Sequence, residues 1–549
     1  MKTKISIIVL FIIYTANAQV QNYNWNFGRF MGMGWKETEN KIVPGIFGSP
    51  PELLSDLPKY YTGSQLATLE GCFTISDNNG DLIVYSDGIR LYNKDNNVIS
   101  TSNLTGNPSS AQSGTIVPYP NSNGNFVVLS LGNNSSDNLA YRVLTRNGSN
   151  YTTNNANTPL DGHKGKLGET VTAGKHSNKN DIWVLAVGRG NSNIEGNMTG
   201  HPYLNVWKIF DNSPTQNTIQ HEIVTSLDLG DQGVIGNSQP NGYVRFTNDT
   251  RHFVWMNFGY GGNVAAGGVP FICYGDFNNT TGEITNVRIK RGIQEGTSYG
   301  YGVEFTNDNK YLYVTLSASD VTNNQNSALL VFDFQELLNA NSQTDIDTIV
   351  PIKKFVTPPG NPQHSPNPYF GALQTGPDGR IYIPSLAKKE VFLIDNPKEP
   401  ENLRIYRYEN PLVTNIGSGP YTLNTSYWGL PNFAVPWYNT AIEISQAPSS
   451  LCVNKTIPFN LFVVDGHGFD KVVKIIIDYG DGSQTKEYNG ADIVPGLKNE
   501  SHIYKEIGEY KIRVNSYDIN NELINTTFKT ILINICTIKV NPYLRGEIE

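Results

Sequence analysis

The stretch Phe305-Thr-Asn-Asp-Asn-Lys-Tyr-Leu-Tyr-Val314 sets the pattern for most of the chain. A short apolar segment leads into a turn of Asn and Asp, and an aromatic, β-branched segment follows. Turn residues between two β-forming segments are typical of a β-hairpin. Phe246–Trp255 and Gln374–Pro384 repeat this order, as do Phe73–Tyr85 and, less regularly, Lys175–Leu185.

A third β-forming segment follows several of these hairpins. The third segments are Tyr203–Ile209, Phe271–Tyr274, Leu329–Phe332 and Glu390–Ile394. The units recur about every 40–65 residues, a spacing typical of four-stranded propeller blades. One such sheet cannot bury both of its faces alone, whereas blades stacked around an axis bury each other's faces. We therefore predict an all-β fold with a β-propeller of seven blades, within a range of six to eight.

Composition supports the same fold class. Of the 549 residues, 11% are aromatic and 16% are charged, and the net charge at pH 7 is −8. Aromatic and β-branched residues favour sheet, while Asn, Gly and Pro favour turns. No basic stripe runs along the sequence, which argues against nucleic acid as a partner.

A secretory signal peptide is predicted at residues 1–18. Lys2 and Lys4 supply its positive end, Ile5–Ile13 the apolar run and Ala16-Asn17-Ala18 the small-residue cleavage site. The alternatives are an N-terminal anchor and a core strand. No later run approaches about 18 apolar residues, so we expect no transmembrane segment after signal removal. The predicted location is therefore secreted or at the outer-membrane surface.

Seven short segments carry a resemblance to a known family. They are Asn24–Gly28, Glu70–Asp77, Tyr85–Gly88, Gly106–Ser113, Tyr301–Phe305, Gly376–Gly379 and Gly429–Phe433. In this order they resemble secreted β-propeller surface proteins (WD40/YVTN-like) from Bacteroidetes, which often carry PKD domains and are often exported by type IX secretion. The resemblance implies a propeller over residues 19–440, closed by its N-terminal strand and the Gly429–Phe433 segment.

The sequence pattern changes after residue 440. Ile475–Gly482, Ser501–Tyr504 and Gly508–Val514 resemble a PKD domain, an immunoglobulin-like β-sandwich, over residues 441–540. The motif residues are Asp478, Gly480, Asp481, Gly482, His502, Tyr504, Gly508 and Tyr510. Longer relatives commonly end in a type IX sorting domain. The tail at residues 541–549 does not resemble one, so the resemblance leaves the export route open.

Export makes disulfides available to the four cysteines. Cys452 and Cys536 bracket the C-terminal part of the chain and are the one disulfide candidate. The alternative is that these two, together with Cys72 and Cys273, are small buried hydrophobic residues. No Cys-x-x-Cys spacing occurs, so we expect no zinc site.

Other motifs suggest chemistry only weakly. Asp77, Asn79 and Asp81 place oxygen ligands at alternate positions, as calcium loops do, but turn preference also explains them. Calcium is thus the only cofactor under consideration. Ser298 lies in a Gly-x-Ser-x-Gly pattern without the helix that a nucleophile elbow requires, so we interpret it as a loop residue. The eight histidines show no metal-ligand spacing.

Aromatic residues offer a carbohydrate-stacking platform, because aromatic faces bind sugars. The candidates are Trp207, Trp255, Tyr299, Tyr301, Trp428 and Trp437. Most of them alternate along predicted strands, so packing within blades is the favoured interpretation.

No catalytic constellation is visible, so we predict a non-enzymatic binding protein for adhesion to, or recognition of, a protein or glycan at the cell surface. One alternative is a carbohydrate-active enzyme with its site in the propeller channel, which needs paired carboxylates at a defined separation. Glu70, Glu169 and Glu304 are acidic candidates without a pairing visible in the sequence. The other alternative is a structural component of a surface assembly.

Overall fold

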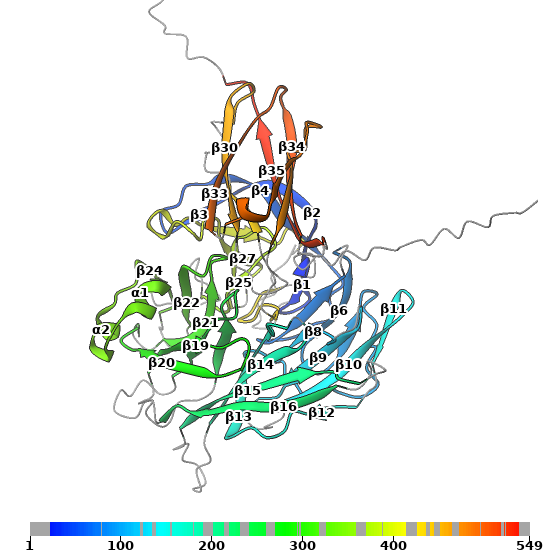
Figure 1. The fold of residues 1–549 in the computed structure, drawn as a ribbon, viewed down its shortest axis with the longest axis vertical. Helices are drawn as coiled ribbons and strands as arrows, with labels where there is room; N and C mark the ends of the chain where they lie inside the picture. The colour runs from blue at the N-terminus through cyan, green and yellow to red at the C-terminus, as the bar shows by residue number, and fades with distance from the viewer. Residues whose placement is uncertain are drawn as a thin grey trace, which may run out of the picture.

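The computed structural model is almost entirely β-structure (Figure 1). It describes residues 22–536 with gaps. The gaps are 78–79, 121–123, 134–138, 154–155, 179, 190–200, 214–218, 231–240, 260–268, 294, 296–297, 318–325, 358–368, 387, 413–424, 435–439, 444–450, 464–471, 495, 518–520 and 522. The predicted signal peptide therefore lies outside the described residues. Within the described part of the chain, no helix is long and apolar enough to cross a bilayer.

Within the described residues, seven sheets follow one another along the propeller region, and each is built mainly from consecutive antiparallel strands. The first three contain β1 (Asn24–Phe27), β2 (Met31–Val43) and β4 (Glu52–Tyr61); β5 (Phe73–Ser76), β6 (Leu82–Ser86) and β7 (Leu91–Asn93); and β8 (Gly114–Pro118), β9 (Phe126–Leu131), β10 (Leu139–Asn147), β11 (Asn150–Thr153) and β12 (Thr158–Pro159).

The next two sheets contain β13 (Lys166–Lys175), β14 (Ile182–Arg189), β15 (Pro202–Phe210) and β16 (Gln220–Asp228); and β17 (Gly242–Phe246), β18 (His252–Asn257), β19 (Ile272–Phe277) and β20 (Ile284–Lys290). The last two contain β21 (Tyr299–Phe305), β22 (Tyr311–Ser317), β23 (Ala328–Asp333) and β24 (Lys353–Val356); and β25 (Gln374–Thr375), β26 (Ile381–Pro384), β27 (Glu390–Ile394), β28 (Ile405–Glu409) and β3 (Gly45–Ile46). Two short helices, α1 (Phe334–Asn339) and α2 (Gln343–Thr348), separate β23 from β24.

The sheets are arranged as the blades of a propeller. The first strands of successive sheets contact one another, from β5 through β8, β13, β17 and β21 to β25. The faces between blades are apolar, and the indole rings of Trp183, Trp207 and Trp255 are fully buried there. The predicted all-β propeller is therefore the observed fold, and its seven sheets match the favoured blade number.

The ring closes where the two ends of the propeller meet. Thr425 pairs with Arg29 in an antiparallel bridge, and Pro431 pairs with Cys72 in a parallel one. The backbone N–H of Trp428 donates to the carbonyl of Leu69 (3.0 Å), and its own carbonyl accepts from the N–H of Ala372 (2.7 Å). Residues 425–433 thus lie between β5 and the approach to β25, as the family resemblance implied.

A two-sheet sandwich follows the propeller. One sheet contains β29 (Thr440–Glu443), β30 (Thr456–Val463) and β33 (Gly496–Ile503). The other contains β32 (Lys486–Asn489), β31 (Lys474–Asp478), β34 (Gly508–Tyr517) and β35 (Leu523–Ile533). Alternate residues such as Ile475 and Ile477 face a shared core with Leu461 and Val514, because successive side chains of a strand point to opposite faces.

The residues of the PKD-like motif gather at one turn of this sandwich. Gly480 has a φ of +77° after β31, where a side chain would meet the backbone of Lys511. His502 lies 2.7 Å from the carboxylate of Asp481 and stacks on Tyr479. The Tyr504 hydroxyl donates to the Tyr479 carbonyl (3.0 Å). Partial burial raises the pKa of Asp481, but hydrogen bonds from Ser483 and His502 outweigh it and hold this pKa below its usual value.

The sandwich contacts the propeller at its seventh and first sheets. Thr530 of β35 donates its N–H to the Asp56 carboxylate (2.8 Å), and Phe528 packs edge-on against Tyr23. Burial lowers the pKa of Lys529, which lies near Asp395 and Asp378. The strands that contact one another around the axis, from β5 to β25, are the inner strands of the blades. Asp378 belongs to the turn that follows the inner strand β25, so the sandwich lies at the face of the propeller where the inner strands end. Figure 1 shows it beside β2 and β4.

Cys452 and Cys536 form a disulfide across 84 residues of sequence, and Cys72 and Cys273 are free and buried. A disulfide restricts the unfolded chain, so we expect the Cys452→Ala/Cys536→Ala variant to lower the free energy of unfolding of the sandwich by about 2–4 kcal/mol. Urea unfolding with and without reductant measures this. The double variant is the control and should not respond to reductant. Equal midpoints for the oxidised and reduced wild-type protein would contradict the prediction.

Candidate functional site: the mouth of the propeller channel

Four polar side chains meet where the inner strands begin. Glu70 precedes β5, Glu169 is near the start of β13, and Tyr243 and Tyr301 lie near the starts of β17 and β21. The inner strands run side by side in one direction, so their first residues share one end of the channel. We call the site formed by Glu70, Glu169, Tyr243 and Tyr301 the channel mouth.

The carboxyl groups of the mouth influence each other. Burial and the nearby charge of Glu169 raise the pKa of Glu70 well above its usual value, and interaction with the Tyr301 hydroxyl opposes this only in part. The backbone holds Glu169 in place, because its carbonyl accepts from the N–H of Gln112 (2.9 Å) and its carboxylate from that of Ala111 (3.4 Å). A buried carboxyl whose pKa is raised by a second carboxyl is a feature of many functional sites.

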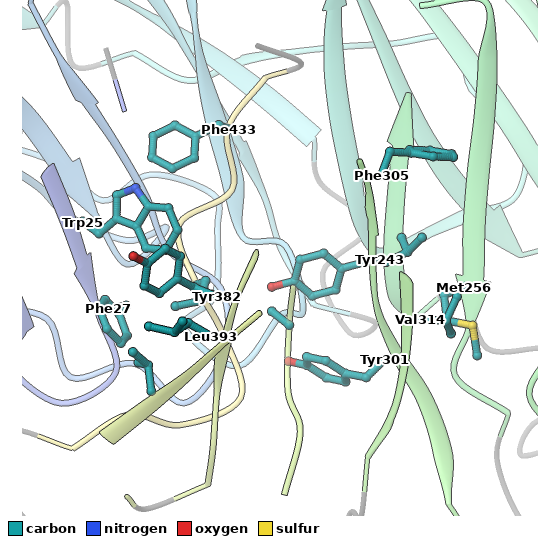
Figure 2. Packing of buried hydrophobic residues seen from close by; sticks show 14 of the residues in the cluster. Trp25, Phe27, Tyr243, Met256, Tyr301, Phe305, Val314, Tyr382, Leu393 and Phe433 are labelled. Atoms are coloured by element: carbon teal, nitrogen blue, oxygen red, sulfur yellow. The ribbon is translucent and has the colours of Figure 1, made fainter. Parts of the chain in front are cut away.

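The two tyrosines of the mouth are buried, with 1% of Tyr243 and 2% of Tyr301 exposed. Their rings are 5.5 Å apart, and Figure 2 shows both hydroxyl oxygens pointing to the same side. Tyr301 interacts with Glu70 and Tyr243 approaches the Leu430 backbone, but neither hydroxyl reaches a partner with ordinary hydrogen-bond geometry. Buried polar groups are normally satisfied, so two unsatisfied hydroxyls in one place point to an external partner.

A network of side-chain amides lies beside the mouth. The Asn432 side chain donates to the carbonyls of Gly114 (2.9 Å) and Val171 (3.0 Å) and accepts from Gln112 (3.1 Å). Gln112 in turn bonds both the N–H and the carbonyl of Val244 in β17. These residues join the closing segment to three successive blades, those of β8, β13 and β17, so polar groups lie next to the mouth.

Glu304, the third acidic candidate, serves a different purpose. It is buried one strand-length below the mouth, 3.4 Å from the guanidinium of Arg245, and it accepts from the N–H of Thr375. Burial raises the pKa of Glu304, and Arg245 opposes that effect. The structure therefore brings Glu70 and Glu169 together and assigns Glu304 to an internal ion pair.

Half-exposed aromatic rings lie beside the mouth. Trp428 follows the closing bridge at Thr425, and Tyr299 stacks on Phe258 with ring centroids 4.8 Å apart. The other members of the predicted aromatic platform are distributed differently. Trp207, Trp255 and Tyr301 are buried in or between blades, and Trp437 lies outside the described residues.

The remaining sequence candidates have local structural roles. Asp77 accepts from the N–H of Asp81 (2.9 Å), and Asp81 pairs with Lys36, while Asn79 lies outside the described residues. Among the side chains that are described, no three His, Cys, Asp or Glu residues gather as a metal site. Ser298 is buried in a turn, where its hydroxyl accepts from the N–H of Glu295.

Sequence reasoning did not find Tyr243, Gln112 or Asn432 as site residues. The signal that could have indicated this region is the position of two glycines, Gly71 and Gly302. A Cβ at Gly71 would lie 2.4 Å from the Ser110 carbonyl, and one at Gly302 2.9 Å from that of Gly371. Both glycines mark places where neighbouring inner strands approach closely, next to the polar residues of the mouth.

We expect Glu70→Gln to raise the melting temperature at pH 7. The pKa of Glu70 is raised in the folded protein, so the folded state binds more protons than the unfolded state, and stability falls as pH rises above the unfolded value near 4.5. The gain should be largest at neutral pH and vanish at pH 4. Thermal unfolding from pH 4 to pH 8 measures it, with exposed Glu283→Gln as control. A gain independent of pH would contradict this prediction.

No family model matches the chain, and no curated protein matches its sequence. Among solved structures, the periplasmic gluconolactonase PpgL of Pseudomonas aeruginosa gives a TM-score of 0.31 at 8% identity, over 72% of this chain and 92% of that one. Sqt1 of Saccharomyces cerevisiae gives 0.35 at 8%, over 82% and 95%. The α-L-arabinofuranosidase of Lactobacillus brevis gives 0.31 at 11%, over 57% and 89%. These likenesses are too distant to assign an activity.

Proposed function

We propose that the protein is a secreted or cell-surface binding protein that recognises a glycan or protein ligand at the channel mouth. One observation carries the proposal. Two buried tyrosine hydroxyls without ordinary hydrogen-bond partners adjoin two carboxyl groups at one end of the channel. A ligand rich in hydroxyl or N–H groups would satisfy all four side chains, and the half-exposed rings of Trp428 and Tyr299 would stack on it.

The distribution of connections supports this face as the binding face. Several long connections, between β14 and β15, β18 and β19, and β24 and β25, join strand ends that lie on the side of the mouth. The opposite side carries the turns between the first two strands of most blades, the connection that contains the helices α1 and α2, and the sandwich. Loops on a rigid scaffold commonly carry binding function. In this proposal the sandwich, interpreted as a PKD domain, is a spacer that leaves the mouth free.

The test is a glycan array and a pull-down from an outer-membrane fraction with purified residues 19–549. We expect a ligand whose binding is weakened by Tyr243→Phe and Tyr301→Phe, each of which removes only a hydroxyl. Tyr151→Phe, in outer strand β11, is the matched control. A ligand that binds all variants equally would place recognition elsewhere. Capture of outer-membrane assembly proteins independently of these tyrosines would favour the structural-component alternative.

A carbohydrate-active enzyme is the second candidate, favoured by the coupling of Glu70 to Glu169. Two carboxyl groups with one pKa raised suit a general acid and a base or nucleophile. Hydrolysis or lyase activity on a bound glycan, abolished by both Glu70→Gln and Glu169→Gln, would establish this function. Binding without turnover would favour the non-enzymatic proposal.

A further inference from the structure

The first sheet of the propeller contains a strained residue at the junction with the sandwich. In the ladder between β2 and β4, the two residues Ser55 and Asp56 stand opposite the single residue Asn40, which makes a β-bulge. Asp56 has a φ of +57°, a left-handed conformation that is unfavourable for a residue with a Cβ and for which glycine is the usual choice. Strained residues persist where the surrounding structure holds them, often for a specific contact, so the partner of the Asp56 side chain is informative.

The partner of this side chain is a backbone group of the sandwich. Asp56 is 3% exposed, and its carboxylate accepts a hydrogen bond from the N–H of Thr530 (2.8 Å). Thr530 belongs to β35, the last strand of its sheet among the described residues. The Ser55 hydroxyl donates to the carbonyl of the same residue at 3.4 Å. The bulge thus engages both backbone groups of one edge residue, which would otherwise be open to pairing with another strand.

Asn40, the residue opposite the bulge, extends the contact to a second strand of the sandwich. Its side-chain oxygen accepts from the N–H of Asp56 (3.2 Å), and its side-chain N–H donates to Glu509 of β34 (3.1 Å). The charges around the bulge are favourable as well. Burial lowers the pKa values of Lys511 and Lys529, and the Asp56 charge opposes this effect in both. The carboxylate therefore lies among cationic side chains of the sandwich.

A second bulge of the same form provides a comparison. In the ladder between β19 and β20, Asn286 and Val287 stand opposite Gly275, and Asn286 has a φ of +50°. Its side chain donates to Asp276 of the neighbouring strand (2.6 Å), so this bond stays within one blade. The left-handed residue of the first bulge differs in one respect, because its side chain crosses from the propeller to the sandwich.

We propose that the Ser55–Asp56 bulge is a latch that fixes the sandwich to the propeller in one orientation. The edge-on contact of Phe528 with Tyr23 adds apolar area to this junction. A charge-assisted hydrogen bond to one backbone N–H adds geometric specificity, because it forms only at one position and direction. The sandwich is then a rigid arm, and the channel mouth keeps a constant orientation relative to it. This inference concerns the arrangement of the two parts and does not depend on the ligand of the mouth.

Hydrogen exchange at the Thr530 amide of the full chain tests the latch. Asp56→Gly removes the carboxylate and suits the left-handed conformation, so the variant should fold. We expect the Thr530 amide to exchange about 10-fold faster or more, since a hydrogen bond to a charged group has effects of this size. The Ile531 amide should not change, because it faces β34 within the sheet. Asp56→Asn keeps an oxygen acceptor and tolerates the same conformation, so it should retain most of the protection.

Spin labels report the orientation of the two parts. Exposed Ser149→Cys in the propeller and exposed Thr485→Cys in the sandwich supply the labelling sites. Electron-spin distance measurements should give one narrow distribution with Asp56 in place and a broad one for Asp56→Gly.

Asn286→Gly is the matched control, because it relieves the same strain at a bulge that bonds within its own blade. It should leave the exchange of Thr530 and the distance distribution unchanged. Thr530 exchange in Asp56→Gly at the wild-type rate would overturn the inference, and so would a distance distribution as narrow as that of the wild type. Equal effects of Asp56→Gly and Asn286→Gly would overturn it as well.

Discussion

Gly429→Ala is expected to prevent the propeller from closing, with a loss of about 4 kcal/mol in the free energy of unfolding. An ideal Cβ at Gly429 would lie 1.6 Å from the carbonyl oxygen of Glu70, which is backbone and cannot rotate away. Relief requires the closing segment to move from β5, which breaks the bond from Asn432 N–H to the Cys72 carbonyl and that between Trp428 and Leu69. The expected loss of stability therefore comes from the hydrogen bonds that break when the segment moves to avoid the clash.

Chemical unfolding followed by tryptophan fluorescence measures this effect. Gly508→Ala is the matched control, because a Cβ at Gly508 would have only ordinary contact, 3.5 Å from the Tyr510 ring. Unfolding midpoints that are equal for Gly429→Ala and Gly508→Ala would show that the segment does not pack against Glu70 as described.

Arg245→Met is expected to destabilise the protein by about 3–5 kcal/mol, because it leaves the buried Glu304 carboxylate without its counter-ion. Both side chains are at most 5% exposed. The variant also removes the donors to Val303 and Gln374. The pKa of Glu304 is already raised by burial, and without Arg245 it should rise further. The loss of folding stability caused by Arg245→Met should therefore grow as pH increases from 4 to 8.

The double variant Arg245→Met/Glu304→Gln separates charge from packing. If the unpaired charge dominates, Glu304→Gln should restore part of the stability that Arg245→Met removes, and the dependence on pH should disappear. Urea unfolding of the wild type, both single variants and the double variant forms the complete cycle. A double variant no more stable than Arg245→Met would show that lost packing, not charge, is responsible.

The blades were predictable because their signal is local. In Phe305–Val314 the turn residues and the strands they join lie within one short stretch, so the sequence alone indicates a hairpin. The disulfide between Cys452 and Cys536 was predictable because these two of the four cysteines bracket the C-terminal part of the chain. The ring then follows from stacking similar sheets, without knowledge of any particular contact between blades.

The mouth was not predictable, because no local pattern encodes it. Glu70 and Glu169 stood out as acidic residues, but their proximity arises only when β5 and β13 are placed around one axis. In the sequence, Glu304 appeared equivalent to them, and only the structure shows that it pairs with Arg245 from a neighbouring blade. Asn432 looked like one more polar residue in an Asn-rich chain, and only the closed ring shows it spanning to Gly114 and Val171.

The meeting of both propeller ends in one closure also governs how the chain can be made. Until residues 425–433 have been synthesised, β5 and the approach to β25 lack the segment that lies between them, and the disc stays open. Apolar blade faces remain uncovered throughout that time, which exposes a long nascent chain to aggregation. A chaperone that covers these faces until residues 425–433 are available should therefore raise the yield of closed propeller.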